Sequence, residues 1–215
     1  MNKIVLDLEF TKVSDKELRE ICKEEIIQFG AVKLNAADEK VSEFVAYVKP
    51  AHTVLSSKVS KLTHITEEML ENADGFAKVF AEFLDWVGEE AYQVYSWSLN
   101  DLDVVKGEVA LENVSDKRVE VLFENWVDLQ AIIGQIIGIS QSLSLVNVLR
   151  AANETFEGLQ HSAIVDAENT AKLVSLVSDE EELNRKLGPV IEMFQPSEPL
   201  MCTMGDLFKG ICITC

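Results

Sequence analysis

Three segments near the start of the chain carry the closely spaced apolar residues that are typical of β-strands. They span residues 4–10, 25–34 and 42–48, and the third runs into Pro50. Proline cannot donate a hydrogen bond to a neighbouring strand, so it favours a strand end at this point. We expect these three segments to form an antiparallel meander.

From Thr66 onward the apolar residues recur at the 3.6-residue spacing of helices, as Phe76, Phe80 and Val87 do. Further helices are expected over residues 101–112, 129–139, 143–152 and 163–177, and further strands over residues 91–97 and 119–123. This order predicts an α/β fold. Its five-stranded mixed sheet would join the meander to two parallel strands, with helices on both faces.

Composition and length favour one domain, because 215 residues with 47% hydrophobic content can form a substantial core. We expect this domain to span residues 1–188. Residues 189–215 hold three of the four prolines and are expected to form a C-terminal tail.

The charge balance is strongly acidic, with 19 Lys and Arg against 37 Asp and Glu, a formal net charge of −18. This argues against a protein that covers long nucleic acid by neutralising its phosphates. An enzyme that holds a few nucleotides at a strand end remains possible if divalent cations lie between it and the substrate. The first residues do not resemble a signal peptide, and no apolar stretch reaches the ~18–20 residues of a membrane span. We therefore expect a cytoplasmic protein.

Four cysteines, Cys22, Cys202, Cys212 and Cys215, are expected to be reduced thiols in this compartment. Cys212 and Cys215 form a CxxC pair. A structural zinc site needs four ligands, and nearby only Cys202 offers a third, so no zinc site is expected.

The first candidate for chemistry is a pair of acids in the first strand. Side chains alternate across a strand, so Asp7 and Glu9 share a face. Two carboxylates side by side repel each other and resist desolvation, and divalent cations would relieve both costs. The alternative is a strand end with a hydrated acidic face.

Two later segments add further candidates. Asp101 follows the fourth strand, where α/β sheets bind ligands, although Asn100 or Asp101 could instead cap the next helix. His161 precedes Asp166 by five residues, which predicts a loop histidine, a cap at Ser162 and a carboxylate in the first turns of a helix. The alternative is a surface histidine beside an ordinary helical aspartate.

The remaining histidines, His52 and His64, lie in segments expected to be loops. We interpret both as structural or solvent-exposed.

Taken in order, these residues resemble the three motifs of the DnaQ-like (DEDDh) 3′→5′ exonuclease superfamily. Residues 7–11 (Asp-Leu-Glu-Phe-Thr) are similar to the first motif, and Trp97 followed four residues later by Asp101 is similar to the second. His161-x4-Asp166 followed by alanine is similar to the third, and favours the histidine branch over the tyrosine branch.

The resemblance covers about residues 3–178 and is nearest the KapD-like and small-RNA or histone-mRNA 3′-exonuclease branch. Further landmarks are residues 25–32, 47–50, 62–66 and 126–129. Two residues depart from the pattern of that branch: Ser98 and His64 stand where it has glycine.

The resemblance implies a ribonuclease-H-like fold and a metal-dependent 3′→5′ exonuclease that releases nucleoside 5′-monophosphates from single-stranded RNA or DNA. It assigns two Mg²⁺ or Mn²⁺ ions to Asp7, Glu9, Asp101 and Asp166. It assigns the general base to His161, and proton acceptance near neutral pH suits an imidazole.

By the same resemblance, Phe10 and Leu62 are expected to contact the terminal nucleotide. Two alternatives stay open: a DNA-directed proofreading or repair exonuclease, and a catalytically silent interaction module. Loss of an acid would mark the silent module, whereas all five catalytic-type residues are present. The sequence predicts no membrane partner and does not indicate which protein partners the chain has.

Overall fold

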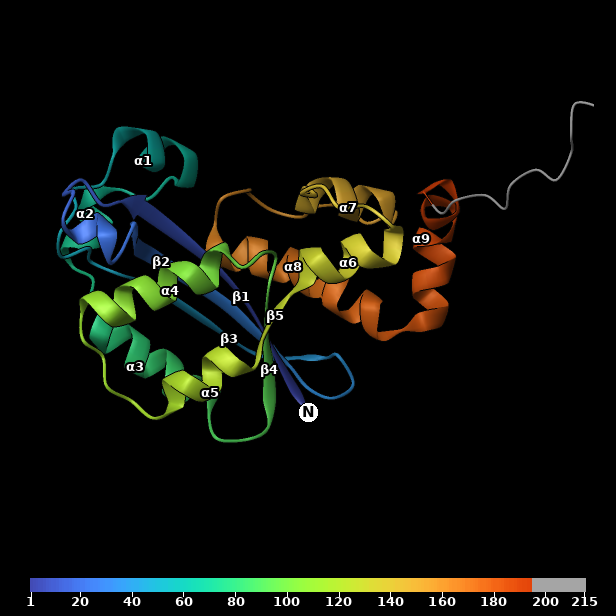
Figure 1. The fold of residues 1–215 in the computed structure, drawn as a ribbon, viewed down its shortest axis with the longest axis horizontal. Helices are drawn as coiled ribbons and strands as arrows, with labels where there is room; N and C mark the ends of the chain where they lie inside the picture. The colour runs from blue at the N-terminus through green and yellow to red at the C-terminus, as the bar shows by residue number, and fades with distance from the viewer. Residues whose placement is uncertain (195–215) are drawn as a thin grey trace, which may run out of the picture.

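A five-stranded sheet forms the centre of the molecule (Figure 1), seen in a computed structural model that describes residues 1–194. Its strands are β1 (Asn2–Lys12), β2 (Glu24–Leu34), β3 (Lys40–Tyr47), β4 (Tyr92–Ser96) and β5 (Trp126–Asp128). The spatial order is β3-β2-β1-β4-β5. Strands β1, β2 and β3 pair antiparallel, and β4 and β5 continue parallel to β1. The expected mixed sheet with a three-strand meander is confirmed.

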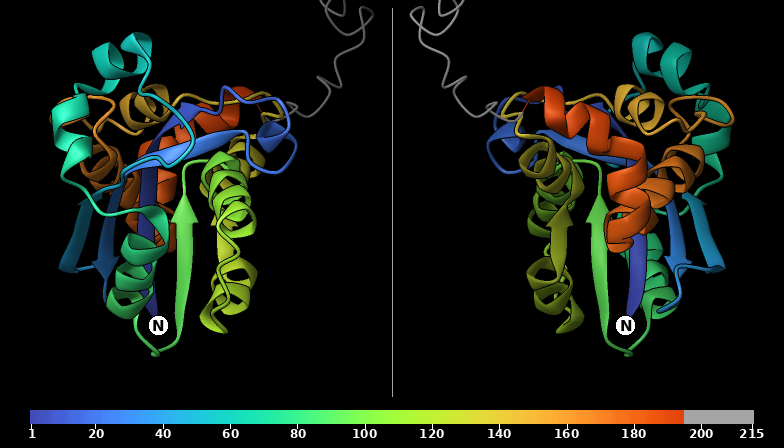
Figure 2. Two further views of the ribbon diagram at one scale, coloured as in Figure 1. Left: turned by 90° about the vertical axis from the view of Figure 1, so that its left-hand side faces the viewer. Right: turned by 90° about the vertical axis from the view of Figure 1, so that its right-hand side faces the viewer.

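Helices lie on both faces of this sheet (Figures 1 and 2). In chain order they are the 3₁₀ turn η1 (Leu18–Glu20) and α1 (Ser57–Thr63), α2 (Glu67–Glu71), α3 (Phe76–Val87), α4 (Asn100–Leu111), α5 (Arg118–Glu124), α6 (Leu129–Ile137), α7 (Leu145–Ala151), α8 (Ala163–Ser178) and α9 (Glu180–Phe194). None of these described helices is long and apolar enough to span a membrane.

Alternation along β1 divides its side chains between two cores. Ile4, Leu6 and Leu8 join a buried cluster with α3, α4 and α5 on one face of the sheet. Val5 joins a second cluster with α6, α7, α8 and α9 on the other face. Because successive side chains point to opposite faces, Asp7 follows Val5 onto the face that α8 covers. The strand therefore carries its first acid toward the second helical layer.

Helix α3 supplies the aromatic part of the first core. Phe76, Phe80 and Phe83 are buried there against Phe29 of β2. The rings of Phe76 and Phe80, four residues apart, stack with centroids 5.0 Å apart. Such a pair adds about 0.5–1.5 kcal/mol beyond the burial of its area. The helical spacing expected for this segment is confirmed.

The fifth strand was predicted at the wrong place. Residues 119–123 belong to helix α5, and the strand that pairs with β4 is the short β5 after it. The apolar run of this segment imitates a strand. In the structure, however, Val119 and Leu122, three residues apart, are buried, while Val121 is exposed. That pattern is one face of a helix.

Two helices extend beyond the expected elements. Helix α1, before Thr66, was not predicted. Helix α9 runs through Pro189 to Phe194, with Val190 and Ile191 packed against the second core, so it crosses the expected boundary between residues 188 and 189. The division into residues 1–188 and 189–215 itself stays a prediction.

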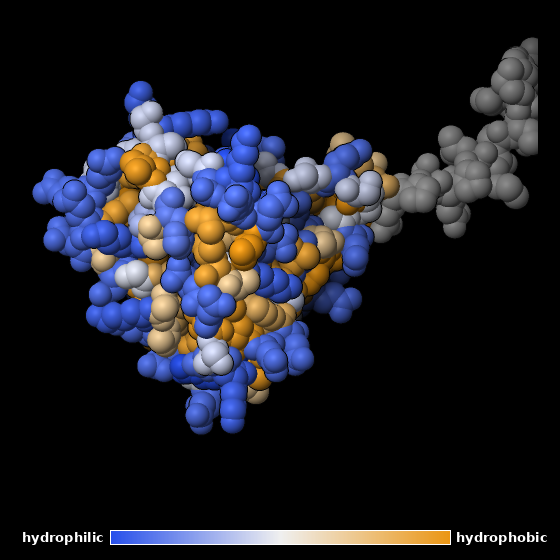
Figure 3. Space-filling model, turned by 60° about the vertical axis from the view of Figure 1, so that its left-hand side comes forward, coloured by the Kyte–Doolittle hydropathy of each residue, from blue (hydrophilic) through white to orange (hydrophobic). Residues whose placement is uncertain are grey.

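The expected thiols Cys202, Cys212 and Cys215 lie outside the described residues, whereas Cys22 is buried and free. The surface view in Figure 3 is mostly hydrophilic, with an apolar area near the middle of that face.

Candidate active site

The first strand carries Asp7 and Glu9 to the point where its regular pairing with β2 is interrupted. The register of β1 against β2 shifts between Glu9 and Phe10, which marks a bulge. The extra residue is Ile27 of β2, which has no partner in β1, and bulges often lie beside active sites. Both carboxylates lie in one cavity with Phe10.

The third acid comes from the first turn of α4, just after the carboxyl end of β4. Asp101 is buried, and its Oδ1 accepts a hydrogen bond of 3.1 Å from the backbone N–H of Leu8. The carboxylate therefore reaches across to β1, between the two acids of that strand. Asp103 is exposed and does not line this cavity. At the start of the helix, the Ser98 hydroxyl accepts a hydrogen bond of 3.3 Å from the Asn100 N–H.

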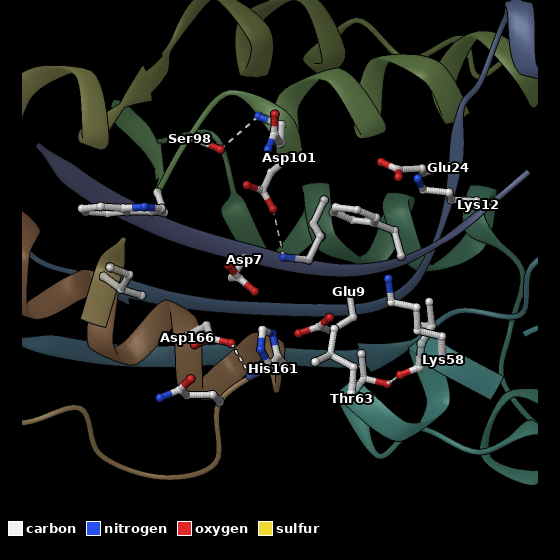
Figure 4. Close-up of a pocket in the computed structure, with 18 of the residues that line it drawn as sticks. Asp7, Glu9, Lys12, Glu24, Lys58, Thr63, Ser98, Asp101, His161 and Asp166 are labelled. Atoms are coloured by element: carbon white, nitrogen blue, oxygen red, sulfur yellow. Dashed lines mark hydrogen bonds between the residues drawn. The ribbon is translucent and has the colours of Figure 1, made fainter. Parts of the chain in front are cut away.

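The fourth acid lies in the first turns of α8, whose N-terminus packs directly on β2. The Ala163 N–H donates a 3.1 Å hydrogen bond to Gln28 of β2. Gly30 of β2 lies so close that a Cβ there would be 2.1 Å from the backbone of Ala163 and Ile164. A residue without a side chain is therefore needed at this contact. This close packing brings Asp166 onto the face of Asp7 and Glu9 (Figure 4).

His161 occupies the loop before α8, as expected. Its backbone has φ 65°, in the left-handed region, and its N–H donates a 2.8 Å hydrogen bond to Asp166 Oδ2. Ser162 takes the expected N-cap position, but its side chain makes no capping hydrogen bond. Potential ligand atoms of Glu9, His161 and Asp166 all lie within 4.8 Å of one another. The exposed imidazole thus lies beside two of the four acids (Figure 4).

The five residues line one cavity of about 770 Å³, within the usual size range of ligand pockets. Phe10 and Leu62, the residues expected to meet the terminal nucleotide, line it as well. Leu62 belongs to α1 and is 47% exposed, so its side chain is available to a ligand. Behind the cavity, the Trp97 indole N–H and the Gln130 amide both donate to the Leu143 carbonyl, which fixes one wall.

Burial raises the pKa values of all four carboxyls, and repulsion from neighbouring carboxylates adds to the shift in Asp7, Glu9 and Asp101. Burial, then Asp101, Asp166 and Glu9, raise the pKa of Asp7 well above its ordinary value. Burial followed by Asp166 and Asp101 raises the pKa of Glu9 to about 8. Burial raises the pKa of Asp101 to about 7, although the Leu8 N–H opposes the shift, and burial also raises the pKa of Asp166. The protein alone does not stabilise these acids in their charged form.

The donor set fits divalent metal ions. Four carboxylates from three elements supply the oxygen ligands that Mg²⁺ and Mn²⁺ prefer. A bound cation would also remove the repulsion and desolvation that raise these pKa values. The alternative in which Asp101 only caps its helix does not account for its hydrogen bond to β1.

Sequence reasoning missed two cations that line the same cavity, Lys12 and Lys58. Simple alternation would place Lys12, the last residue of β1, on the face opposite to Glu9, so the strand pattern did not assign it to the cavity. Lys58 belongs to α1, which was not predicted. Its spacing of four residues before Leu62 would have indicated a shared helical face once that helix was known.

The sequence matches a family model described as Exonuclease (RNase T) over residues 4–174. This range includes all four acids and His161. ERI1 exoribonuclease 2 of Mus musculus is 29% identical over 191 residues, covering 79% of this chain and 27% of that protein. The PolC-type DNA polymerase III of Staphylococcus haemolyticus is 32% identical over 97 residues, 45% of this chain and 6% of that protein. The chain thus spans about a quarter of the length of the first relative.

Among solved structures, the nuclease domain of 3′hExo, described as a DEDDh family member bound to rAMP, superposes with a TM-score of 0.70. The two are 23% identical, and the match covers 84% of this chain and 94% of that one. This likeness confirms the expected ribonuclease-H-like α/β fold. Because the family model matches most of its residues, the chain belongs to the Exonuclease family, as the resemblance of its motifs to DnaQ-like exonucleases predicts.

Proposed function

We propose that this protein hydrolyses single-stranded RNA or DNA from a free 3′ end and releases nucleoside 5′-monophosphates. One observation carries the proposal: Asp7, Glu9, Asp101 and Asp166 converge from β1, α4 and α8 on one cavity that His161 also lines. Retention of all five residues also argues against the catalytically silent alternative.

In this proposal the four carboxylates hold two Mg²⁺ or Mn²⁺ ions. Bound there, the ions would activate water and offset negative charge at the phosphorus. Asp7 and Glu9 suit this role because the sheet orders their backbone, while their carboxylates make no hydrogen bond to the protein groups around them in residues 1–194. Asp101 is held in place by the Leu8 N–H.

His161 accepts the proton of the water that attacks the last phosphodiester. The new bond joins the water oxygen to phosphorus, and the bond between phosphorus and the 3′ oxygen of the preceding nucleotide breaks. The freed 3′ oxygen takes up a proton and becomes the new strand end. A loop position beside Glu9 and Asp166 places the imidazole where such a transfer is possible.

Phe10 and Leu62 hold the terminal nucleotide in this proposal. Their apolar side chains line the cavity from β1 and α1, so the base would pack between two secondary-structure elements. Base packing on apolar side chains is tolerant of sequence, which suits an enzyme that removes one nucleotide after another.

The relatives differ in whether their names indicate RNA or DNA as the substrate. The mouse relative is named an exoribonuclease and matches 79% of this chain, whereas the matched DNA polymerase III covers 45%. We therefore propose RNA as the preferred substrate and retain DNA proofreading or repair as the alternative.

The test is a digest of matched single-stranded RNA and DNA oligonucleotides, labelled at the 5′ end, with Mg²⁺ or Mn²⁺. Stepwise shortening from the 3′ end and release of 5′-monophosphates are expected, with RNA cleaved faster. Matched strands with a blocked 3′ end serve as the control and should resist cleavage. Undiminished activity in excess EDTA, or shortening from the 5′ end, would overturn the proposal.

A further inference from the structure

The cavity that holds the four acids is not uniform in charge. Apart from His161, the only cations that line it among residues 1–194 are Lys12 and Lys58. In Figure 4 they lie on one side of the cavity, and Asp7, Asp166 and His161 lie toward the other. Trp97, Phe156 and Leu145 of α7 form an apolar part of the lining that packs against the second core, and α7 lies well apart from α1 in Figure 1.

Five of the other lysines among residues 1–194 form ion pairs with acids. Lys40 pairs with Glu43 and Glu168, and Lys186 pairs with Glu154. Lys12 and Lys58 take part in none of the ion pairs found within residues 1–194. Both side chains are exposed and face the one cavity that a polyanion is proposed to enter.

We propose that Lys58, assisted by Lys12, binds the phosphate on the 5′ side of the scissile one, so that the strand leaves the site between the end of β1 and α1. This inference rests on the proposed function, because it takes the 3′-terminal nucleotide to lie at the acids. Apart from Lys12 and Lys58, the described lining of the cavity offers a phosphate no lysine or arginine.

The geometry of α1 links this phosphate site to the nucleotide site. Lys58 and Leu62 are four residues apart on α1 and therefore lie on one helical face. One short helix thus presents an apolar contact for the terminal base and a charge for the next phosphate. Lys12 shares its side of the cavity with Glu24, whose negative charge reduces the attraction there (Figure 4). Lys58 is therefore the stronger of the two contacts.

The experiment compares two dinucleotides that differ by one phosphate. An unphosphorylated dinucleotide has only the scissile phosphate, whereas its 5′-phosphorylated form adds the phosphate that Lys58 is proposed to bind. The measured quantity is the ratio of kcat/KM for the phosphorylated over the unphosphorylated form, because general damage to the enzyme cancels in this ratio. The wild-type protein is expected to prefer the phosphorylated form.

Lys58→Ala should lower that ratio by about threefold, the effect of losing one partly exposed charge pair, and Lys12→Ala by less. Alanine keeps α1 helical, since it has the highest helix propensity. Lys61→Ala is the matched control, because Lys61 is exposed on the same helix but does not line the cavity. It should leave the ratio unchanged.

A second measurement is the salt dependence of binding to a longer single strand. Loss of one phosphate contact should reduce the slope of log K against log salt by about 0.7 in Lys58→Ala. An unchanged ratio and slope in Lys58→Ala, or an equal loss in Lys61→Ala, would overturn the inference. If the wild-type protein cleaves neither dinucleotide nor a longer strand, the proposed function fails and this inference with it.

Discussion

At the residue scale, Asp101 and Asp103 of α4 allow the site to be tested by two matched changes. Asp101 is 6% exposed and bonded to the Leu8 N–H, whereas Asp103 is exposed and lies outside the cavity. Asp101→Asn should lower kcat/KM on the order of a hundredfold or more, because a ligand charge is lost. Asp103→Asn should stay within about threefold of wild type, the size of a small surface charge effect. Steady-state kinetics on one oligonucleotide decide the matter, and the reverse order of effects would show that the motif is misaligned.

A substitution of His161 tests whether this loop histidine accepts the proton of the attacking water. His161→Ala should lower kcat by about 10²–10⁴-fold, the usual contribution of a positioned base. Metal titrations of both proteins show whether ion binding is kept.

His52→Ala provides the control for His161→Ala, because His52 lies outside the cavity beside Glu112. It should keep near wild-type kcat. If His161→Ala also does so, or fails only because metal no longer binds, the histidine mechanism is wrong for this protein.

Single residues also show what the sequence could predict of the site. Asp7 and Glu9 were found because a strand puts alternate residues on one face, and His161 because its spacing from Asp166 excludes one helical face. All four, with Asp101, meet in the structure. Lys12 was missed because strand alternation places it on the face opposite to Glu9, and Lys58 because it depends on α1, a short helix without a strong apolar period.

At the scale of elements, the contact between β2 and α8 determines where the fourth acid lies. Gly30→Ala would place a Cβ 2.1 Å from the backbone of Ala163 and Ile164, and backbone atoms cannot move aside as a side chain can. We expect a loss of about 1–3 kcal/mol or more in the free energy of unfolding, as for overpacked cores. Activity should fall as well, because the start of α8 carries Asp166. Denaturant unfolding and kinetics on the same variant provide the measurement.

Gly75→Ala is the matched control for Gly30→Ala. A Cβ at Gly75, the N-cap of α3, would meet nothing within 4 Å. Its effect on stability should stay below about 1 kcal/mol, the usual range for exchanges at a helix N-cap. Equal stability of the two variants would show that α8 does not depend on this close approach.

Elements differ in how far local pattern determines them. Strand β1 and helix α3 were predicted correctly because each has a long, consistent period. Helix α5 was predicted as a strand because its apolar run, Val119 to Phe123, fits both periods over so few residues. Only the packing of Val119 and Leu122 against the first core decides for the helix. The strand β5 has three residues, too few for any period to be read.

At the scale of the whole molecule, the net charge of −18 adds to the electrostatic repulsion between the four acids of the site. Repulsion among acidic groups destabilises a compact state. The face in Figure 3 is largely hydrophilic, whereas the four carboxyls of the cavity are partly or fully buried. The site is therefore a place where function opposes stability.

The metal-free protein should accordingly lose stability as pH rises. The pKa values of these carboxyls are raised in the folded state, to about 7 for Asp101 and about 8 for Glu9. The folded state thus binds more protons than the unfolded chain. Stability from these groups is fully present below their unfolded pKa values, near 4, and is lost as pH rises through the folded values.

Divalent ions should reverse this trend. In excess EDTA the melting temperature should fall between about pH 5 and pH 8, the interval between the unfolded and folded pKa values. With Mg²⁺ or Mn²⁺ at about 100 times its dissociation constant, binding adds about 2.7 kcal/mol, which is several degrees for a chain of this length. The increase should be larger at pH 8 than at pH 6, because ligands must lose their protons to bind metal.

Asp7→Asn should raise the melting temperature in EDTA at pH 8, since it removes one repelling charge, and should lose most of the gain from metal. Thermal unfolding of the wild type and of Asp7→Asn at pH 6 and pH 8, with and without metal, measures these effects. A melting temperature of the wild type that metal leaves unchanged at pH 8 would show that the four carboxylates do not hold ions.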